Sequence, residues 1–460
     1  MIERLSTGNK RLDSILDGGL PADALNLIVG LPGTGKTMLV QQCVFANATP
    51  ERPAVYFSTI SEPLDKLVRY AQTQSFFDVA KVGTAIIFED LGPVVDRGGV
   101  VAVIETIESV VRRYRPGIVV IDSLAALRAY ASVEEFRAFL HDLAGRASAF
   151  RASHFWVGEY TIADIASAPE FAVADATIFL SMRDTDQRSR RELEVLKLRG
   201  SDFLSGKHAC RLTEHGIEVY PRLADPIDIS EYDFDPCRHS TGIPALDEIV
   251  GDGYLPGTTT LLCGPTGIGK TIMALQFLYH AARNGSPGII ASLHEDDLQL
   301  GRVVRALGWD PEEPGIEFMH ASPVDLYVDQ WVYALLDRAE AIGAKRIVVD
   351  SVDDLSFAVP DPVRFREYLY SLSQRCTRQG ISVMMTQEVP ELFGLERFAS
   401  DKLSHMCDSV LLLHYVRNGD RLSRAMTALK ARATPLDPET REFRITADGI
   451  VLGEQLAVRD

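Results

Sequence analysis

The chain of 460 residues lacks the patterns that mark metal-stapled, secreted or membrane-spanning proteins. It has six cysteines, none in C-x-x-C spacing, so we expect buried, reduced thiols rather than a zinc site or a disulfide framework. No apolar run approaches the length of a membrane span, and residues 1–9 carry no secretory signal pattern. We therefore expect a cytoplasmic protein with no membrane partner.

Positive charge is also scarce. The 47 basic residues are outnumbered by 64 acidic ones, for a net charge of −17, and this balance disfavours a nucleic-acid partner. The nearest approach to a basic run is Arg188 to Arg191, which we interpret as a solvated turn. The hydrophobic content of 46% is typical of a folded protein, and the length favours two domains.

Two glycine-rich stretches organise the chain. Residues 30–37 and 264–271 both match G-x-x-x-x-G-K-[ST], and each follows an apolar strand and precedes a helix. The glycines let the backbone aim its N–H groups at phosphate oxygens, and the helix adds the positive end of its dipole. We therefore expect two ATP sites, formed by Gly33, Thr34, Gly35, Lys36 and Thr37 and by Gly267, Ile268, Gly269, Lys270 and Thr271.

The two loops belong to an internal repeat. Ser-Thr-Gly-x3-Leu-Asp opens each copy, at residues 6–13 and 240–247, and both openings precede their loop by the same spacing. This predicts a duplicated domain, with one copy at residues 1–222 and the other at 240–460. The acidic stretch at 223–239, which carries two Asp-Pro pairs, is the expected linker.

Within each copy, apolar strands alternate with helices. This predicts an α/β fold with a mostly parallel sheet covered by helices on both faces. In the first copy we expect strands at 54–58, 85–88, 117–121 and 154–157, with 176–182 and 193–198 as an antiparallel edge. In the second copy we expect strands at 288–292, 346–350, 382–386 and 409–415.

Acidic residues follow these strands at positions suited to phosphate chemistry. Asp122 and Asp350 end apolar strands downstream of the loops, where they can hold Mg²⁺ together with the Thr37 and Thr271 hydroxyls. Hydrolysis also needs a group that orients or deprotonates water. The candidates are His294 and Glu295 in the second copy and Glu62 in the first, although Glu62 also fits an exposed acid at a helix start.

The paired loops, the repeated openings and the Ile-Asp-Ser-Leu at 121–124 resemble the KaiC-type circadian-clock ATPases of the RecA/DnaB-type P-loop superfamily. The resemblance covers nearly the whole chain. It implies two tandem RecA-like domains in an ATP-dependent homo-oligomeric ring, a hexamer, that signals to a protein partner. It further implies that Lys197 and Arg199, and Lys430 and Arg432, reach the γ-phosphate of a neighbouring subunit.

The same resemblance implies Ser/Thr autokinase activity, with Ser404 at the family's phosphorylated serine and Ser409 as the next candidate. His405 stands where the family has a phosphorylated threonine. The family also has an adjacent Glu-Glu pair after the second strand of each domain. Here Ile60-Ser61 stands at that place in the first copy, with Glu62 shifted by one, and His294-Glu295 stands there in the second.

Two alternative functions remain open. One is a DNA-acting motor or recombinase on the same fold, which the acidic balance disfavours. The other is a nucleotide-bound scaffold with little turnover, which the altered acids allow.

Overall fold

The computed structural model describes residues 3–59, 64–185, 188–223, 237–359, 361–389, 403–418, 421–436 and 438–456. The chain divides into two compact units, Met1–Arg222 and Leu223–Asp460. Glu62 and residues 224–236, which make up most of the expected linker, lie outside the described residues.

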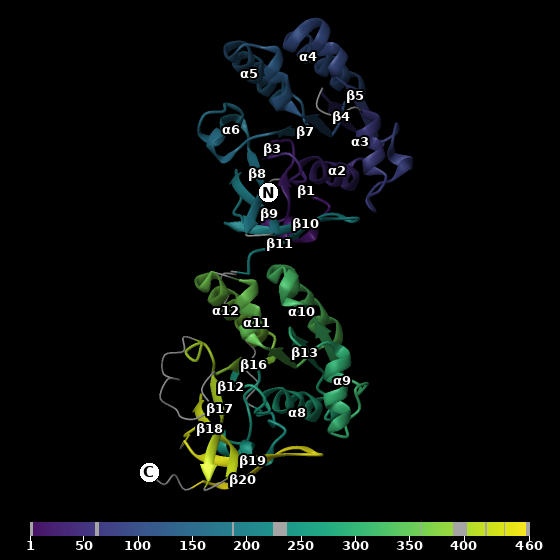
Figure 1. The fold of residues 1–460 in the computed structure, drawn as a ribbon. Coiled ribbons are helices and arrows are strands. Elements are labelled where there is room, and N and C mark those ends of the chain that lie inside the picture. The colour runs from purple at the N-terminus through teal and green to yellow at the C-terminus, as the bar shows by residue number, and fades with distance from the viewer. Residues whose placement is uncertain are drawn as a thin grey trace. The chain divides into compact units, whose positions relative to one another are not determined.

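The first unit is built on a nine-stranded sheet in the order β11-β10-β9-β8-β3-β7-β6-β4-β5 (Figure 1). The strands from β8 to β5 pair in parallel, and β9, β10 and β11 extend the sheet in antiparallel fashion. The strands are β3 (Leu25–Gly30), β4 (Ala54–Ser58), β5 (Ile86–Asp90), β6 (Ile118–Asp122), β7 (Ser153–Gly158), β8 (Ala176–Thr185), β9 (Arg188–Leu198), β10 (Lys207–Thr213) and β11 (Gly216–Tyr220); β1 (Arg4–Leu5) and β2 (Leu20–Pro21) form a separate pair.

Helices cover both faces of this sheet, with α2 on one face and α4 and α5 on the other (Figure 1). Successive residues of a strand point to opposite faces, so Ile118 and Val120 of β6 pack toward α2, and Val119 and Ile121 pack toward α4 and α5. Both faces are apolar, which is why the strand is continuously hydrophobic. The helices are α1 (Lys10–Ile15), α2 (Lys36–Asn47), α3 (Leu64–Ala71), η1 (Val79–Lys81), α4 (Gly92–Tyr114), η2 (Leu124–Tyr130), α5 (Val133–Ala149), η3 (Ile162–Ala166) and α6 (Glu170–Val173).

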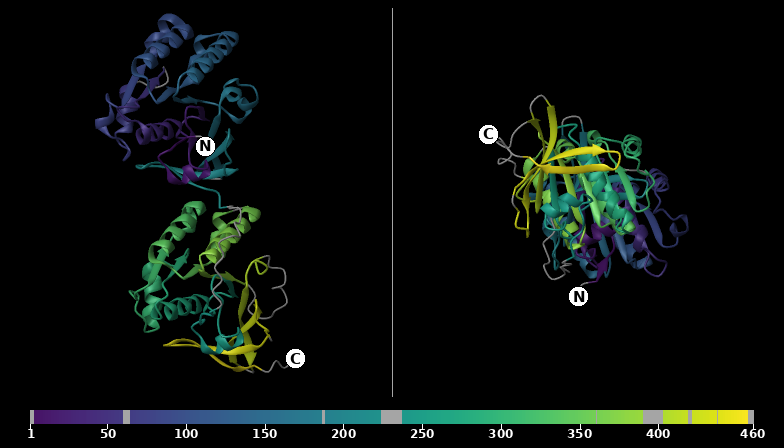
Figure 2. Two further views of the ribbon diagram at one scale, coloured as in Figure 1. Left: turned by 180° about the vertical axis from the view of Figure 1, so that it is seen from behind. Right: turned by 90° about the horizontal axis from the view of Figure 1, so that it is seen from below.

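The second unit repeats the same plan. Its sheet has the order β14-β13-β15-β16-β12-β17-β18-β19-β20, and the antiparallel extension is yellow in Figure 2. Its strands are β12 (Thr259–Gly264), β13 (Gly288–Ser292), β14 (Ile316–His320), β15 (Arg346–Asp350), β16 (Ser382–Glu388), β17 (Ser409–Asn418), β18 (Arg421–Ala431), β19 (Thr440–Thr446) and β20 (Gly449–Gln455). Its helices are α7 (Pro244–Ile249), α8 (Lys270–Arg283), α9 (Asp297–Ala306), η5 (Pro323–Asp325), α10 (Val328–Ile342), α11 (Val352–Ala358) and α12 (Pro362–Arg378). Among the described helices of both units, none is long and apolar enough to cross a membrane.

The parallel core follows the sequence prediction, but the antiparallel side extends further. The expected edge at residues 193–198 is an interior strand, β9, which begins at Arg188 and pairs with β10. The interpretation of Arg188 to Arg191 as a turn was therefore wrong: these residues form strand pairs with β8. Residues 188–191 contain no apolar side chain, so they lack the alternation of apolar and polar residues by which a half-buried strand is recognised in a sequence.

The cysteines fit the expectation at five positions. Cys43, Cys210, Cys263, Cys376 and Cys407 are buried, and burial raises the pKa of Cys210 and Cys376 to about 12. Cys237 is exposed, so the prediction of a buried thiol was wrong there. It lies near the end of the acidic stretch at 223–239, which lacks an apolar period.

An arginine lies inside the second unit. Arg346, the first residue of β15, is 3% exposed and donates to the carbonyl oxygens of Phe277 and, at 2.9 Å, of Ser240. Its guanidinium carbon lies 4.2 Å from the centre of the Phe277 ring. Burial lowers its pKa to about 10, so it remains charged at neutral pH. The side chain thereby fixes the repeat opening at Ser240 to the helix that follows the second loop.

We expect Arg346→Met to destabilise the second unit by about 2–3 kcal/mol, because the buried Phe277 carbonyl and the part-buried Ser240 carbonyl lose a charged donor. Fluorescence of Trp309 and Trp331 during urea unfolding, in a Trp156→Phe background, reports on this unit. The control Arg338→Met, which breaks only a half-exposed ion pair, should cost less than about 1 kcal/mol. Equal midpoints for the two variants would contradict the assigned role.

Candidate active sites

Both phosphate loops form the turn between a central strand and a helix. The first joins β3 to α2 and the second joins β12 to α8. Gly35 and Gly269 precede the helices with φ of 106° and 119°, a conformation that favours glycine. Neither helix start has a side-chain cap, so its first backbone N–H groups remain available to an anion. At Gly30 an added Cβ would lie 2.0 Å from the Leu180 carbonyl oxygen, which excludes other residues there.

The loop lysines fold back over their own loops. Lys36 Nζ donates to the Leu31 carbonyl at 2.9 Å, and Lys270 Nζ donates to the Gly264 carbonyl at 2.8 Å. Burial lowers the pKa of both ammonium groups, while the nearby carboxylates of Asp122 and Asp350 act in the opposite direction. An arriving phosphate can therefore replace weak carbonyl acceptors with charged ones.

The predicted hydroxyl and carboxylate meet in both units. Thr37 Oγ1 donates to Asp122 Oδ2 at 2.8 Å, and Thr271 Oγ1 donates to Asp350 Oδ2 at 2.7 Å. These oxygens are of the type that Mg²⁺ prefers, and Mg²⁺ usually keeps several waters and phosphate oxygens as further ligands. The described ranges contain no cluster of three or more His, Cys, Asp or Glu suited to a metal, so such an ion would depend on the nucleotide.

In the second unit, the acid predicted after the second strand lies beside Asp350, the expected Mg²⁺ ligand. Glu295 follows β13, whose Ser292 pairs with Asp350, and Leu293 N donates to the Asp350 carbonyl. Burial and the Asp350 charge raise the pKa of Glu295, and His294 opposes them. Glu295 Oε2 is buried without a hydrogen-bond partner among the described residues. The equivalent position in the first unit, around Glu62, lies outside the described residues.

The predicted basic pairs lie at the end of each sheet where the central parallel strand begins. The phosphate loop lies at the other end, where that strand finishes. Arg199 N donates to the Asp175 carbonyl, and Asp175 N donates to Leu25, the first residue of β3. The loop follows the other end of β3, whose six residues are separated by five steps of about 3.3 Å, so it lies roughly 17 Å away. Arg199 forms a 3.2 Å ion pair with Asp175 and is 60% exposed. Lys197 Nζ donates to the carbonyls of α6.

The second unit repeats this arrangement. Arg432 forms a 2.9 Å ion pair with Asp408 and is 70% exposed, and Asp408 N donates to Thr259 at the start of β12. Lys430 Nζ donates to the carbonyls of Cys407 and Ser404, at 2.6 and 3.2 Å. Ser404 therefore also lies at the end of the sheet away from its own phosphate loop.

A sequence model of the KaiC ATPase family matches residues 5–224 and again residues 239–457. The chain belongs to the KaiC ATPase family. This confirms the resemblance drawn from the motifs and the prediction of two tandem RecA-like P-loop domains.

Known KaiC proteins are similar to this chain over almost its full length. The circadian clock oscillator protein KaiC of a Picosynechococcus species is 26% identical over 98% of this chain and 90% of its own length. The circadian clock protein KaiC3 of a Synechocystis species is 28% identical, over 98% and 92%. The KaiC of Synechococcus elongatus is 27% identical, over 97% and 88%.

Two acids beside the loop lysines of this KaiC ATPase were missed by the sequence reasoning. Glu159 follows β7 and its charge acts on Lys36, and Glu388 ends β16 and acts on Lys270. Glu388 also accepts a hydrogen bond from Thr266 of the second loop. The sequence does show an acid at the end of β7 and of β16, one in each copy. Only the strand order reveals that these strands neighbour β3 and β12, which lead into the loops.

A basic residue near the first loop was also missed. Arg191 Nε donates to the Gly33 carbonyl at 3.2 Å, so a residue of β9 contacts the phosphate loop across the sheet. Its register equivalent in the second unit is Arg424, which pairs with Tyr415 as Arg191 pairs with Met182. The equivalence of Arg191 and Arg424 follows from the matching strand pairings in the two units. The local run of arginines does not indicate it.

Proposed function

We propose that both domains of this KaiC-family ATPase bind ATP with Mg²⁺ and hydrolyse it at the boundaries of a cytoplasmic homo-oligomeric ring, a hexamer. The observation that carries the proposal is the threonine–aspartate contact beside each phosphate loop, at 2.8 and 2.7 Å. The named relatives are circadian clock proteins, which supports a cycle that signals to a protein partner.

Nucleotide binding falls to the two loops. The backbone of Gly33 to Gly35, and of Gly267 to Gly269, supplies N–H donors to the phosphates, and Lys36 and Lys270 supply the cations. Thr37 with Asp122, and Thr271 with Asp350, would hold Mg²⁺, which neutralises charge on the phosphate oxygens when bound.

The water that attacks the γ-phosphate needs a proton acceptor. In the second domain Glu295 has a buried oxygen without a hydrogen-bond partner among the described residues and a raised pKa, both of which suit a general base. His294 is the adjacent alternative, and Glu62 is the proposed base of the first domain.

The position of the two arginines, at the end of each sheet away from its phosphate loop, supports ATP sites shared between subunits. Arg199 and Arg432 cannot reach along the length of their own strands to the phosphate loop. Both are exposed, and among the described residues each forms an ion pair with one aspartate. A cation placed on the γ-phosphate stabilises the charge that develops during transfer. We infer that each acts on a neighbouring copy of the chain, with Lys197 and Lys430 beside them.

One experiment separates this function from its alternatives: ATP turnover and oligomeric mass of the intact chain, each with and without ATP–Mg²⁺, together with DNA binding at increasing salt. Turnover with an ATP-dependent ring supports the proposal. A ring that binds ATP without turnover indicates a scaffold, and DNA-stimulated turnover indicates a motor.

A first prediction concerns pH. Because the pKa of Glu295 is raised, the fraction that can accept a proton falls as the pH drops through that raised value. The turnover that depends on Glu295 is the difference between the intact chain and Glu295→Gln. On acidification, this difference should disappear at a higher pH than it would for a glutamate with an ordinary pKa. Steady-state turnover of both chains across the acid range measures this. A Glu295→Gln chain with unchanged turnover would exclude the residue as base.

A second prediction concerns autophosphorylation. Ser404 lies beside Lys430 at the same end of the sheet, away from its own phosphate loop, so a γ-phosphoryl group can reach it only from a neighbouring subunit. Its hydroxyl would pass its proton to Glu295 or His294 of that neighbour and take the phosphoryl group, leaving ADP. After incubation with ATP–Mg²⁺, mass spectrometry should find phosphate at Ser404, or next at Ser409.

The Lys270→Ala chain provides the control, since it should lose this phosphate. Phosphate that persists in Lys270→Ala would assign the transfer to another site. Active turnover with no phosphate between Phe398 and Val410 would refute the autokinase.

A further inference from the structure

The two phosphate loops differ at the positions that their shared motif leaves free. The third residue of the loop is Pro32 in the first domain and Thr266 in the second, and the fifth is Thr34 in the first and Ile268 in the second. Apart from the threonine that follows the lysine, each loop therefore has one hydroxyl, at a different place. The two hydroxyls have different hydrogen-bond partners.

The first loop is fixed from within. Thr34 is buried, and its Oγ1 donates to the Leu31 carbonyl at 2.8 Å. Lys36 Nζ donates to the same carbonyl. When Lys36 turns toward a phosphate, the Leu31 carbonyl keeps its bond to Thr34. The ring of Pro32 also fixes φ at the residue between them and the start of the loop.

The second loop is fixed from outside. Ile268 has no hydroxyl to bind the loop carbonyls, and Lys270 Nζ donates to those of Gly264 and Pro265, at 2.8 and 3.1 Å. The hydroxyl of this loop points instead to the neighbouring strand, where Thr266 Oγ1 donates to Glu388 Oε1 at the end of β16. When Lys270 turns toward a phosphate, this bond remains.

Glu388 is itself held beside the loop. It lies opposite Gly264 in the pairing of β16 with β12, and its backbone N–H donates to Asp353 Oδ2 at 2.6 Å. The next residue, Val389, donates its N–H to the Gly264 carbonyl at 3.1 Å. The carboxylate that receives the Thr266 hydroxyl is therefore attached to a strand end that is bonded to both the loop and α11.

We propose that Glu388 is a positioning residue for the second nucleotide site and acts through Thr266. It holds the first half of the loop in place while Lys270 exchanges backbone carbonyls for phosphate oxygens. A loop that is ordered before its ligand arrives loses less conformational entropy on binding, so the contact raises affinity. This inference rests on the proposed binding of ATP by the second loop.

The first domain contains a matched comparison. Glu159 follows β7 at the place that Glu388 occupies after β16, since Gly158 pairs with Val29 as Gln387 pairs with Cys263. The loop residue equivalent to Thr266 is Pro32, which has no hydroxyl. Glu159 therefore provides the same charge near a loop lysine without the same hydrogen bond.

The test measures Mg–ATP affinity of the full chain by calorimetric titration in a Lys36→Ala background, where only the second site remains. Glu388→Gln and Glu388→Ala both remove the charge, but only glutamine keeps an acceptor for Thr266. Glu388→Gln should bind about fivefold more tightly than Glu388→Ala, as expected for one neutral hydrogen bond. Thr266→Val, which keeps the charge, should weaken binding by a similar factor, and should have little effect when added to Glu388→Ala.

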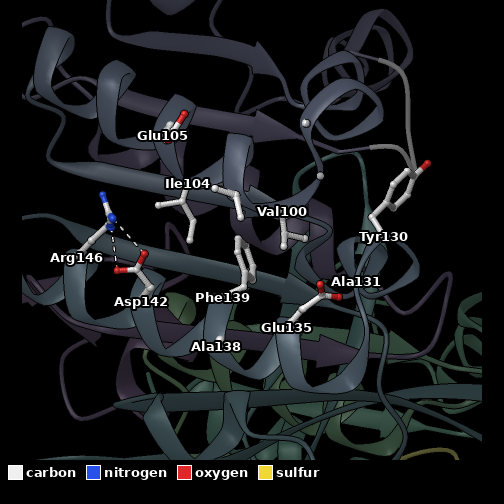
Figure 3. Close-up of a pocket in the computed structure, with 13 residues that line it drawn as sticks. Val100, Ile104, Glu105, Tyr130, Ala131, Glu135, Ala138, Phe139, Asp142 and Arg146 are labelled. Carbon is white, nitrogen blue, oxygen red and sulfur yellow. Dashed lines mark hydrogen bonds and ion pairs between the residues drawn. The ribbon is translucent and has the colours of Figure 1, made fainter.

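The controls use the first site, in a Lys270→Ala background. Glu159→Gln and Glu159→Ala should bind Mg–ATP equally, because Pro32 offers no donor. In both backgrounds Asp142→Asn should leave affinity unchanged. Asp142 forms a 3.0 Å ion pair with Arg146 beside a cavity of about 530 Å³ between α4 and α5, and no phosphate-loop residue lines that cavity (Figure 3).

Equal affinities for Glu388→Gln and Glu388→Ala would overturn the role of Glu388, and so would a Thr266→Val effect that is unchanged in the Glu388→Ala chain. A glutamine–alanine difference of the same size at Glu159 would also overturn it, because no loop hydroxyl is present there. Failure of the Lys36→Ala chain to bind Mg–ATP at all would refute the proposed function of the second loop, and this inference with it.

Discussion

Lys36→Ala and Lys270→Ala should each remove one of the two nucleotides that a subunit binds, and together they should remove both. Each ammonium group is held over its loop at 2.9 or 2.8 Å from a backbone carbonyl, at the point where phosphate oxygens would enter. No other lysine approaches these loops among the described contacts. Equilibrium dialysis with ATP gives the stoichiometry directly.

The same substitutions should weaken the ring. A ligand that binds only the assembled form stabilises it by about 2.7 kcal/mol at a hundred times its dissociation constant, and that contribution disappears with the site. Light scattering with and without ATP–Mg²⁺ should show smaller particles for the double variant. Lys345→Ala, an exposed change distant in sequence from the loops, is the control. A double variant that bound ATP normally and stayed assembled would show that both loop assignments are wrong.

Arg199→Ala and Arg432→Ala should lower ATP turnover of their domains by roughly a hundredfold or more while ATP remains bound. Arginines in this role are worth about 10³–10⁵ in rate in well-studied GTPases. Arg199→Lys should recover only part of the loss, because an ammonium group cannot reproduce the planar, two-pronged donor of a guanidinium. Single-turnover measurements with saturating ATP separate this effect from weaker binding.

Mixing two inactive chains tests whether the sites are shared. In a Glu295→Gln background, in which we expect the second domain to be silent, Arg199→Ala chains keep an intact loop and Lys36→Ala chains keep an intact arginine. If the sites lie between subunits, mixed rings contain some boundaries with both intact residues, and first-domain turnover returns. No recovery in rings shown by mass to be mixed would assign Arg199 to its own subunit and refute the shared site.

The sequence by itself determined the parts of this protein that depend on local patterns. The glycines, lysine and hydroxyl of each loop follow one another in the chain, and their strand–loop–helix context is visible as an apolar run followed by a helical one. Asp122 and Asp350 were found for the same reason, since each ends an unbroken apolar strand. The duplication is visible because two distant motifs recur at one spacing.

Only the tertiary structure decided which residues from separate strands meet. Arg191 and Glu388 contact the loops, and the charge of Glu159 acts on Lys36, because β9, β16 and β7 occupy particular places in their sheets. Strand order leaves no mark in the sequence of any one strand. The sheet also separates Arg199 from its own loop, because Arg199 lies near the first residue of β3 and the loop follows the last residue of that strand.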